Sequence, residues 1–268
     1  MHERNGFRVL KRKLFSTFGK NFFEMEKIIS YPISTIAILL FLLGLIIFHP
    51  IQWICFNLFG YQAHKKSVDY LNLYLLRITL ILGTTYKIEN RESIPENVPL
   101  IFVANHQSLY DIIGIIWFLR KFHPKFVSKK ELGKGIPSIS YNLRHGGSVL
   151  IDRKDPKQAI PTIKKLAEYI ELHHRTAVIF PEGTRSKTGK PKEFAQSGLK
   201  ILCKYAPSAY VIPISINNSW KFVKYGFFPF GLGNRIIFTI HKPLAVKDFT
   251  FETLMEKTEN SIIQAIKI

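Results

Sequence analysis

The feature that most constrains this chain is an uncharged apolar run, ISTIAILLFLLGLIIF, at positions 33–48. A helix on the surface of a soluble domain carries a polar face, and this run has none. An α-helix from Tyr31 to Phe48 would be about 27 Å long, close to the thickness of the hydrocarbon core of a bilayer. A buried core helix is the alternative. A secretory signal peptide is not expected, because no small-residue cleavage site follows. We therefore expect residues 33–48 to associate with a membrane.

A second apolar stretch, VDYLNLYLLRITLIL at positions 68–82, differs because Asp69, Asn72 and Arg77 interrupt it. Their spacing leaves a polar stripe, which is typical of a helix lying in the membrane interface. Basic residues precede the first stretch and flank the second, so the positive-inside rule gives no single-pass orientation. We expect residues 1–84 to form a basic N-terminus and a membrane-associated helical hairpin that dips into the cytoplasmic leaflet (monotopic), with a single span by the first helix as the alternative. The basic residues before the first stretch are Arg4, Arg8, Lys11, Arg12, Lys13, Lys20 and Lys27.

The charge of the chain favours an anionic partner. Lys and Arg number 38 against 19 Asp and Glu, a formal net charge of +19. Nucleic acid, an anionic membrane surface and a phosphorylated substrate all fit this sign. Nucleic acid is the least expected, because its binding segments interleave exposed aromatic with basic residues, whereas Phe here falls mostly inside apolar runs. Cys55 and Cys203 are far apart without ligand-like neighbours, so neither a disulfide framework nor a zinc site is expected.

Residues 85–268 alternate short apolar runs with longer amphipathic ones, the pattern of an α/β domain. Nearly continuous apolar strands indicate a mixed, largely parallel sheet flanked by helices. Ligands of such sheets bind at the carboxyl ends of the strands. The expected strands are residues 99–104, 125–128, 148–151, 177–180, 210–216 and 235–240. The expected helices are residues 109–119, 156–171, 193–205 and 251–266.

The segment NHQSLYD, residues 105–111, follows directly after the expected strand 99–104. A turn at its start would bring the Asp111 carboxylate within hydrogen-bond reach of one imidazole nitrogen of His106. That contact would fix the tautomer, leave the other nitrogen free as a base and stabilise the imidazolium. The alternative is that Ser108 caps the next helix while Asp111 merely complements its positive end. We interpret His106 and Asp111 as a candidate catalytic pair.

The segment FPEGTRS, residues 180–186, also follows an expected strand. Arg185 offers two parallel N–H donors that suit a phosphate, and Gly183 leaves backbone N–H groups accessible. Thr184 adds a hydroxyl, and Glu182 is better suited to hold the loop or Arg185 in place than to perform acid chemistry. An ordinary turn with a solvated arginine is the alternative.

Two further cations follow expected strands. Lys129 lies in the segment SKKEL, and Arg153 ends the segment HGGSVLIDR. Each taken alone is most often a solvated surface charge. If the strands are parallel, these cations would gather at the same edge of the sheet as His106.

In this order, the blocks NHQSLYD, KKEL to GGSVLIDR, FPEGTRS and the short strand VIPI at 211–214 resemble the glycerolipid acyltransferase family of 1-acyl-sn-glycerol-3-phosphate acyltransferases (lysophosphatidate acyltransferases, PlsC type). The resemblance covers roughly residues 85–220. It implies transfer of a fatty acyl group from acyl-CoA or acyl carrier protein to the sn-2 hydroxyl of lysophosphatidate, giving phosphatidate. It also implies that His106 is the general base and that Asp111 orients it.

The resemblance implies a set of substrate-binding residues as well. Recognition of the acceptor phosphate would fall to Arg185, with Lys129 and Arg153 as helpers. The residues that would shape the site are Asn105, Glu182, Gly183 and Thr184.

The chemistry of thioester acyl transfer agrees with this interpretation. A thioester is already activated, so the enzyme must deprotonate an alcohol and stabilise an oxyanion, which requires no metal or redox cofactor. The sequence has no G-x-S-x-G segment and no cysteine in a site block, so a covalent acyl-enzyme is not expected. The expected partners are an anionic membrane surface, lysophosphatidate and the acyl donor, without nucleic acid. The alternatives are an acyltransferase for another lysophospholipid, a lipid hydrolase, and a non-catalytic peripheral membrane protein that binds lipid.

Overall fold

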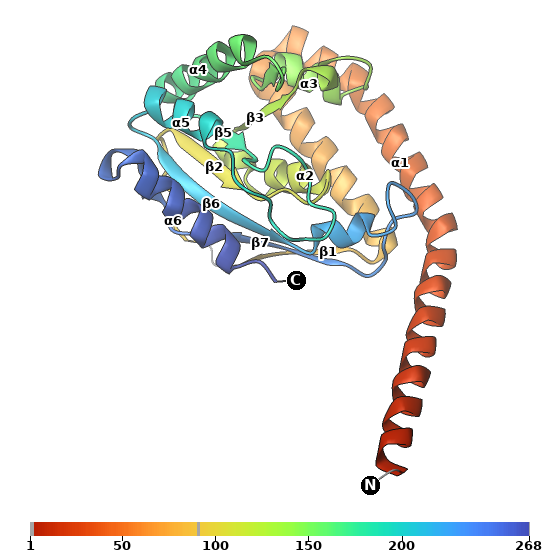
Figure 1. Cartoon of the computed structure of the whole chain (residues 1–268). Helices are drawn as coiled ribbons and strands as arrows, with labels where there is room; N and C mark the ends of the chain where they lie inside the picture. The colour runs from red at the N-terminus through yellow and green to blue at the C-terminus, as the bar shows by residue number, and fades with distance from the viewer. Residues whose placement is uncertain (1–2, 90–91, 268) are drawn as a thin grey trace.

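A mixed, largely parallel β-sheet lies at the centre of the structure, with helices on both of its faces (Figure 1). The structure is a computed structural model that describes residues 3–89 and 92–267, with side chains described from Phe23 onward. The basic side chains expected near the N-terminus, from Arg4 to Lys20, therefore lie outside the described side chains. The predicted fold class is confirmed.

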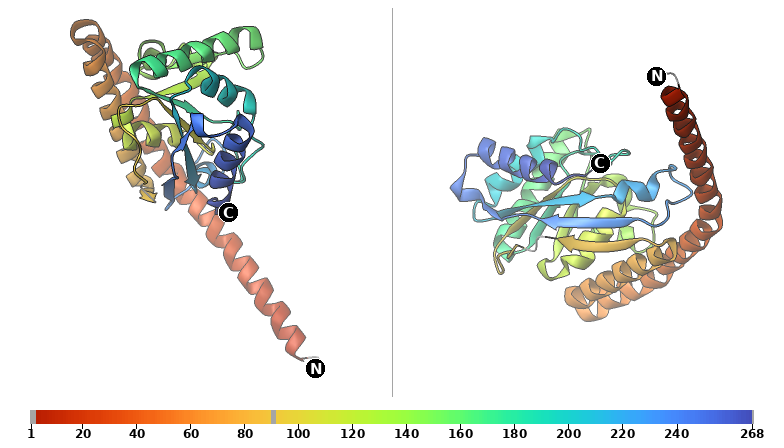
Figure 2. Two further views of the ribbon diagram at one scale, coloured as in Figure 1. Left: turned by 90° about the vertical axis from the view of Figure 1, so that its left-hand side faces the viewer. Right: turned by 90° about the horizontal axis from the view of Figure 1, so that it is seen from below.

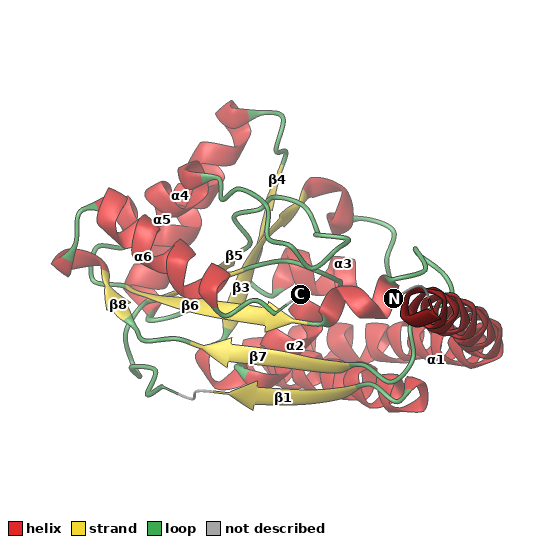
Figure 3. Ribbon diagram, turned by 60° about the horizontal axis from the view of Figure 1, so that its bottom comes forward, coloured by secondary structure: helices red, strands yellow, loops and turns green. Residues whose placement is uncertain are grey.

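The sheet has eight strands within the described residues, in the order β1-β7-β6-β2-β5-β3-β4, with β8 pairing with β6. Its pairs are parallel except that β6 runs antiparallel to β7 and to β8 (Figure 3). As a result, β2, β5, β3, β4 and β6 all end at one edge of the sheet, which we call the carboxyl edge. The strands are β1 (Thr85–Glu89), β2 (Leu100–Ala104), β3 (Pro124–Lys129), β4 (Val149–Ile151), β5 (Thr176–Ile179), β6 (Tyr210–Asn217), β7 (Arg235–Ile240) and β8 (Leu244–Ala245).

Helices cover the two faces of the sheet because successive strand side chains point to opposite sides. In the fully buried strand β2, Ile101 and Val103 face a core formed with α4, α5 and α6, whereas Phe102 faces a core that includes α2. The α-helices are α1 (Glu3–Ile78), α2 (Tyr110–Phe118), α3 (Ile139–His145), α4 (Pro156–His173), α5 (Gln196–Tyr205) and α6 (Phe251–Gln264). The short 3-10 helices are η1 (Thr79–Leu82), η2 (Arg120–Phe122), η3 (Lys130–Gly133), η4 (Ser219–Val223) and η5 (Val246–Asp248).

The N-terminal helix α1 consists of two arms that meet at Gly60. This residue has φ 77° and ψ −170°, a conformation outside the helical region that glycine adopts without a Cβ penalty. The arms run side by side in opposite directions (Figure 2), and the Tyr74 hydroxyl donates a hydrogen bond across them to the Leu40 carbonyl at 2.9 Å. The second arm also contacts α2. A helical hairpin is therefore present, as the sequence predicts.

The outer face of the first arm is apolar and exposed. Leu39 and Ile46 are 62% and 60% exposed, whereas Ala37 and Leu45 on the inner face are buried. Within residues Phe23–Leu82, the most apolar 18-residue segment has a mean hydropathy of 2.5. Among the described helices, α1 alone is long and apolar enough to cross a membrane. Buried core helices meet the same criteria of length and composition, but only 22% of this window is buried.

The second arm differs from the interfacial helix expected from its sequence. Asp69 and Asn72 are buried against the rest of the protein instead of forming an outer polar stripe. Their polar groups find partners within the arm itself, because Asp69 pairs with Lys65 and the Asn72 amide donates to the Val68 carbonyl. Burial therefore leaves these groups hydrogen-bonded, which removes the main cost of placing them inside.

All six expected strands and all four expected helices of the α/β part exist, with ends shifted by up to three residues. The sequence analysis missed β1, β8 and α3. β1 is an edge strand with mostly exposed or half-buried residues, so it carries no continuous apolar run. β8 and α3 span two and seven residues, too few for a periodic pattern to stand out.

Candidate active site

The imidazole of His106 and the carboxylate of Asp111 form a hydrogen bond at the carboxyl edge of the sheet. His106 lies in the loop after β2, and Asp111 lies in the first turn of α2. The distance between His106 Nδ1 and Asp111 Oδ2 is 2.8 Å. The same oxygen accepts the backbone N–H groups of Gln107 at 2.6 Å and Ser108 at 2.8 Å. Asp111 is fully buried, so this local network fixes the position of its carboxylate.

The alternative in which Ser108 caps α2 coexists with this pairing. The Ser108 hydroxyl accepts the N–H of Tyr110 at 3.1 Å, near the start of the helix. Asp111 thus complements the helix N-terminus and contacts His106 at the same time. The two interpretations of the sequence do not exclude each other.

The geometry leaves one nitrogen of His106 for chemistry. The imidazole stacks on the Phe180 ring, with centroids 4.1 Å apart and an angle of 19° between the planes. The His106 side chain keeps 13% of its surface exposed, and no hydrogen bond to Nε2 is found from any residue that the structure describes. With the proton on Nδ1 facing the carboxylate, Nε2 carries the free lone pair of a base.

Glu182 joins the loop after β5 to the loop that carries His106. Its Oε1 accepts the backbone N–H of His106 at 2.8 Å, and its Oε2 accepts the backbone N–H of Lys192 at 2.9 Å. The Ser186 N–H adds a second link by donating to the His106 carbonyl at 2.7 Å. Burial raises the pKa of the Glu182 carboxyl, although both backbone hydrogen bonds act in the opposite direction. Glu182 therefore fixes the backbone of His106 through the His106 N–H, and leaves the imidazole itself free.

Arg185 projects from the same loop without a partner of its own. Gly183 has a positive φ of 68° at the turn, and Arg185 is exposed two residues later. Within residues 3–89 and 92–267, Arg185 takes part in neither an ion pair nor a side-chain hydrogen bond. Thr184 is exposed too, and its hydroxyl accepts a hydrogen bond from the Lys192 ammonium at 2.6 Å. The guanidinium is thus available to an anion close to His106.

The Asn105 side chain bonds to the backbone of β6. Its side chain is fully buried, and its amide nitrogen donates to the Ile216 carbonyl at 2.9 Å. Its amide oxygen accepts the Ile216 N–H at 2.7 Å. Both amide atoms are therefore used to hold the end of β2 against β6. Asn105 can shape the site only through the backbone that leads into His106.

Lys129 and Arg153 lie at the same edge, farther from His106. Lys129 ends β3 opposite Ile151 of β4, and Arg153 follows two residues later; both cations are exposed. The strand order places β5 beside β2, then β3, then β4. At about 4.8 Å between strands, β4 is about 14 Å from β2. Arg185 therefore lies in the loop next to that of His106, whereas Lys129 and Arg153 lie farther along the carboxyl edge from the imidazole.

Sequence reasoning missed several residues that hold the His106 loop from the β6 side. Gln107 is buried; its amide donates to the Gly189 carbonyl at 3.2 Å and accepts the Trp220 N–H at 3.3 Å. The Ser108 hydroxyl forms a short hydrogen bond with the Ser219 hydroxyl. The position of Gln107 beside His106 is a local signal, but its partners are more than eighty positions away in the sequence.

The nucleophiles of the chain lie elsewhere. Cys203 is buried in the core around α5, where burial raises the pKa of its thiol to about 12. Cys55 lies on the first arm of α1. In the described part of the chain, no serine or cysteine side chain bonds to the His106 imidazole, and no group of three His, Cys, Asp or Glu side chains is arranged to hold a metal ion. The pair can thus act on a hydroxyl that a substrate brings.

Comparison with known proteins gives consistent matches. The family model described as Acyltransferase matches residues 85–217. A 1-acyl-sn-glycerol-3-phosphate acyltransferase of Helicobacter pylori is 39% identical over 44% of this chain and 51% of its own length, so the chain spans about half of that relative. The Saccharomyces cerevisiae protein of the same description is 26% identical over 88% of this chain and 78% of its own. The crystal structure of the 1-acyl-sn-glycerophosphate (LPA) acyltransferase PlsC from Thermotoga maritima superposes with a TM-score of 0.68 at 26% identity, covering 86% of this chain and 95% of that one.

Proposed function

Because the chain belongs to the acyltransferase family, we propose that it transfers a fatty acyl group from acyl-CoA or acyl carrier protein to the sn-2 hydroxyl of lysophosphatidate, giving phosphatidate. The observation that carries the proposal is the free Nε2 of His106, whose Nδ1 is held by the buried Asp111 at 2.8 Å beside the unpaired Arg185. The names of the relatives from H. pylori, S. cerevisiae and T. maritima support the choice of acceptor.

The proposed reaction is a direct transfer in one ternary complex. His106 Nε2 takes the proton of the acceptor hydroxyl while the oxygen attacks the thioester carbon. Asp111 stabilises the imidazolium that forms, in the same way as it fixes the neutral tautomer. The tetrahedral oxyanion then collapses, the C–S bond breaks, and the leaving thiolate takes the proton back from Nε2. No residue is acylated, because the acceptor oxygen itself attacks the donor.

The proposed phosphate site begins at Arg185. A guanidinium binds a phosphate through two parallel charge-assisted hydrogen bonds. Lys129 and Arg153 continue the positive edge and would attract the anionic groups of either substrate. In this arrangement Glu182, Gly183 and Thr184 keep the Arg185 loop next to His106, and Asn105 secures the start of the loop that carries His106.

We also propose that the hairpin of α1 lies in the cytoplasmic leaflet of a membrane. The apolar outer face of the first arm and the net charge of +19 both suit an anionic lipid surface. Both proposed substrates carry a fatty chain and an anionic group, so an enzyme seated at the membrane surface would meet them where they reside. The hairpin and the positive charge then serve the same purpose.

The test is the transfer rate of His106→Ala in purified full-length protein with lysophosphatidate and labelled acyl donor. Loss of a general base lowers the rate by about 10²- to 10⁴-fold, while binding to vesicles should persist. The exposed His174→Ala is the matched control and should retain full activity. Transfer by His106→Ala at the rate of the unaltered protein would remove this residue as the base. Parallel assays with acyl-CoA and acyl carrier protein identify the donor, and release of fatty acid without acceptor would indicate a hydrolase.

A further inference from the structure

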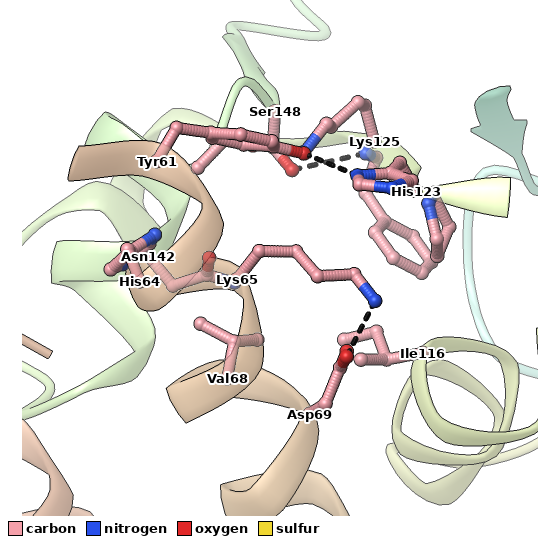
Figure 4. Close-up of a pocket in the computed structure, with 13 residues that line it drawn as sticks. Tyr61, His64, Lys65, Val68, Asp69, Ile116, His123, Lys125, Asn142 and Ser148 are labelled. Carbon is pink, nitrogen blue, oxygen red and sulfur yellow. Dashed lines mark hydrogen bonds and ion pairs between the residues drawn. The ribbon is translucent and has the colours of Figure 1, made fainter. Parts of the chain in front are cut away.

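A polar pocket lies at the opposite edge of the sheet from His106, between the hairpin and the start of β3; Figure 4 shows its lining. The second arm of α1 contributes Tyr61, His64 and Lys65 to its lining. Lys125, at the amino end of β3, contributes an ammonium group, and Ser148 adds a hydroxyl. His106, in contrast, follows the carboxyl end of β2, so the pocket is separate from the candidate active site.

Lys125 is a buried cation in this pocket with an incomplete set of partners. Only 4% of the residue is exposed. Its ammonium donates to the Tyr61 hydroxyl at 2.7 Å and to the Gly146 carbonyl at 2.5 Å, which leaves the third of its three donors free. The carboxylate that lines the pocket, Asp69, is paired with Lys65. The charge of Lys125 is therefore not neutralised by an acid within the described residues.

His64 supplies an independent sign that something is missing from the pocket. The residue is fully buried, and neither ring nitrogen has a hydrogen-bond partner among the described residues. A neutral imidazole carries one donor and one acceptor, and leaving both unpaired inside a protein is costly. Close by, Arg175 adds a further positive charge that acts on both Lys125 and His123.

The cavity between these residues has a volume of about 30 Å³. A buried site needs on the order of 10–15 Å³ to hold one water, so this cavity has room for a small ion but not for a larger ligand. Cations outnumber carboxylates around it, and its polar groups include several N–H or O–H donors. A ligand with negative charge and several acceptor oxygens would neutralise the excess positive charge and accept hydrogen bonds from the free donors. A cation or an apolar molecule would do neither.

We propose that this pocket binds a phosphate-class oxyanion, which would bridge the membrane hairpin and the sheet through Lys125 and His64. The hairpin turn brings a source of such anions close to it. Leu58 and Phe59 are 69% and 70% exposed at the turn, within one helical turn of Tyr61. If these apolar side chains enter a membrane, the pocket opens near the headgroup layer, where phosphate groups are concentrated. A bound headgroup would hold the hairpin against the sheet.

The first experiment measures binding of inorganic sulfate to the full-length protein in detergent, from the rise in Tm relative to sodium chloride of equal ionic strength. Lys125→Met retains the side-chain volume and should weaken sulfate binding at least tenfold. His64→Leu should weaken it as well. Lys165→Met, at an exposed lysine on α4, is the matched control and should bind as the unaltered protein does. Equal affinity in Lys125→Met and the unaltered protein would overturn the proposal.

Two further variants separate this site from the candidate active site. Arg185→Ala and His106→Ala should keep the binding that Lys125→Met loses, whether or not they retain acyl transfer. If Arg185→Ala removes the binding and Lys125→Met does not, the anion occupies the candidate active site and the pocket is not an anion site. Failure of this proposal therefore leaves the proposed reaction untouched, and failure of the reaction leaves the pocket untouched.

The pH dependence gives a readout that a structural role alone would not produce. Burial lowers the pKa of Lys125 to about 7, and burial lowers the pKa of His64 and His123 to about 4. Sulfate keeps its charge from pH 6 to pH 9, so its binding should weaken as Lys125 loses its proton above pH 7. Lys125→Met should remove that dependence. The other titratable or charged groups that act on or contact Lys125 are Tyr61, Lys65 and Asp69 of the second arm and Arg175, which directly precedes β5. His145 of α3 acts on His64.

A final pair of samples distinguishes the sources of the anion. Hydrogen exchange of residues 60–66 is compared in nanodiscs of phosphatidylcholine alone and in nanodiscs that also contain phosphatidate. Protection that increases with phosphatidate, and not in Lys125→Met, identifies a lipid headgroup. Protection that increases only with soluble phosphate identifies a free ion. Absence of protection with either probe, together with unchanged Tm in sulfate, would refute the site.

Discussion

Replacing Asn105 with alanine distinguishes a residue that holds the active-site loop from one that binds substrate. The β2–β6 pairing ends at Ala104 and Ile214. Just beyond it, the Asn105 amide donates to the Ile216 carbonyl at 2.9 Å and accepts the Ile216 N–H at 2.7 Å. The side chain thus continues the ladder by one more step and fixes where the chain leaves β2 to reach His106.

The expected loss of stability follows from these two hydrogen bonds. Alanine leaves a backbone N–H and a backbone C=O of a fully buried Ile216 without their partner. Each such group costs about 1–3 kcal/mol, so the free energy of unfolding should fall by about 2–6 kcal/mol. The free energy of unfolding of a domain is typically about 5–15 kcal/mol, so most domains would remain folded after this loss. Because His106 follows directly, kcat should fall, while KM for the acceptor should change little.

The assay combines urea unfolding in mild detergent with steady-state acyl transfer. Asn260→Ala is the matched control, since Asn260 is exposed on α6 and its replacement should change stability by less than about 0.5 kcal/mol. An Asn105→Ala protein of unaltered stability with a raised KM for the acceptor would refute the reasoning. It would mean that the amide faces the substrate and that Ile216 is satisfied in another way.

Three further variants test the rest of the site. Asp111→Asn should lower kcat by about 10²- to 10⁴-fold in steady-state assays, because the neutral amide lacks the negative charge with which the carboxylate stabilises the His106 imidazolium; a loss below tenfold would contradict this. Arg185→Ala should raise KM for lysophosphatidate about 10- to 100-fold with little change in kcat, because charge-assisted hydrogen bonds contribute about 1.5–3 kcal/mol; its exposed neighbour Lys187→Ala is the control, and an unchanged KM would reassign the phosphate site. Gly189→Ala should lower Tm and transfer together, because the residue has φ 84° and its Cβ would come within 2.4 Å of the indole of Trp220; unaltered Tm would show that the loop can shift freely.

The parts of the site that the sequence could predict are those decided by nearby residues. His106 and Asp111 are five positions apart, so a single turn between a buried strand and a helix is enough to bring them together. Arg185 follows another buried strand, so the rule that parallel strands end at one edge is enough to bring it to the same side. In both cases the residue lies a few positions after a buried strand, so its place at the edge of the sheet can be predicted without the full strand order.

The parts that the sequence could not predict depend on contacts across the fold. Asn105 and Ile216 are 111 positions apart, and nothing local indicates that the amide closes the ladder with β6. The same holds for Gln107, whose partners come from the loops after β5 and β6. In the hairpin, Asp69 and Asn72 read as a polar stripe because their partners within the helix are invisible in a hydropathy pattern. Packing against the rest of the protein buries both side chains, and such tertiary packing commonly overrides what the local sequence pattern favours.

The same contacts connect the hairpin to the imidazole. The Lys224 ammonium pairs with Glu26 of α1 at 2.7 Å. Lys224 directly follows the last residue of η4. At the start of η4, the backbone N–H of Trp220 donates to the Gln107 side-chain oxygen, and the backbone N–H of Gln107 donates to Asp111. A helix with an apolar outer face is thus joined to the carboxyl edge of the sheet by packed, hydrogen-bonded segments. Under the proposed function, a lipid acceptor could therefore keep its fatty chain at the membrane surface while its hydroxyl reaches Nε2, because the element that would enter the membrane also holds the loop that positions the base.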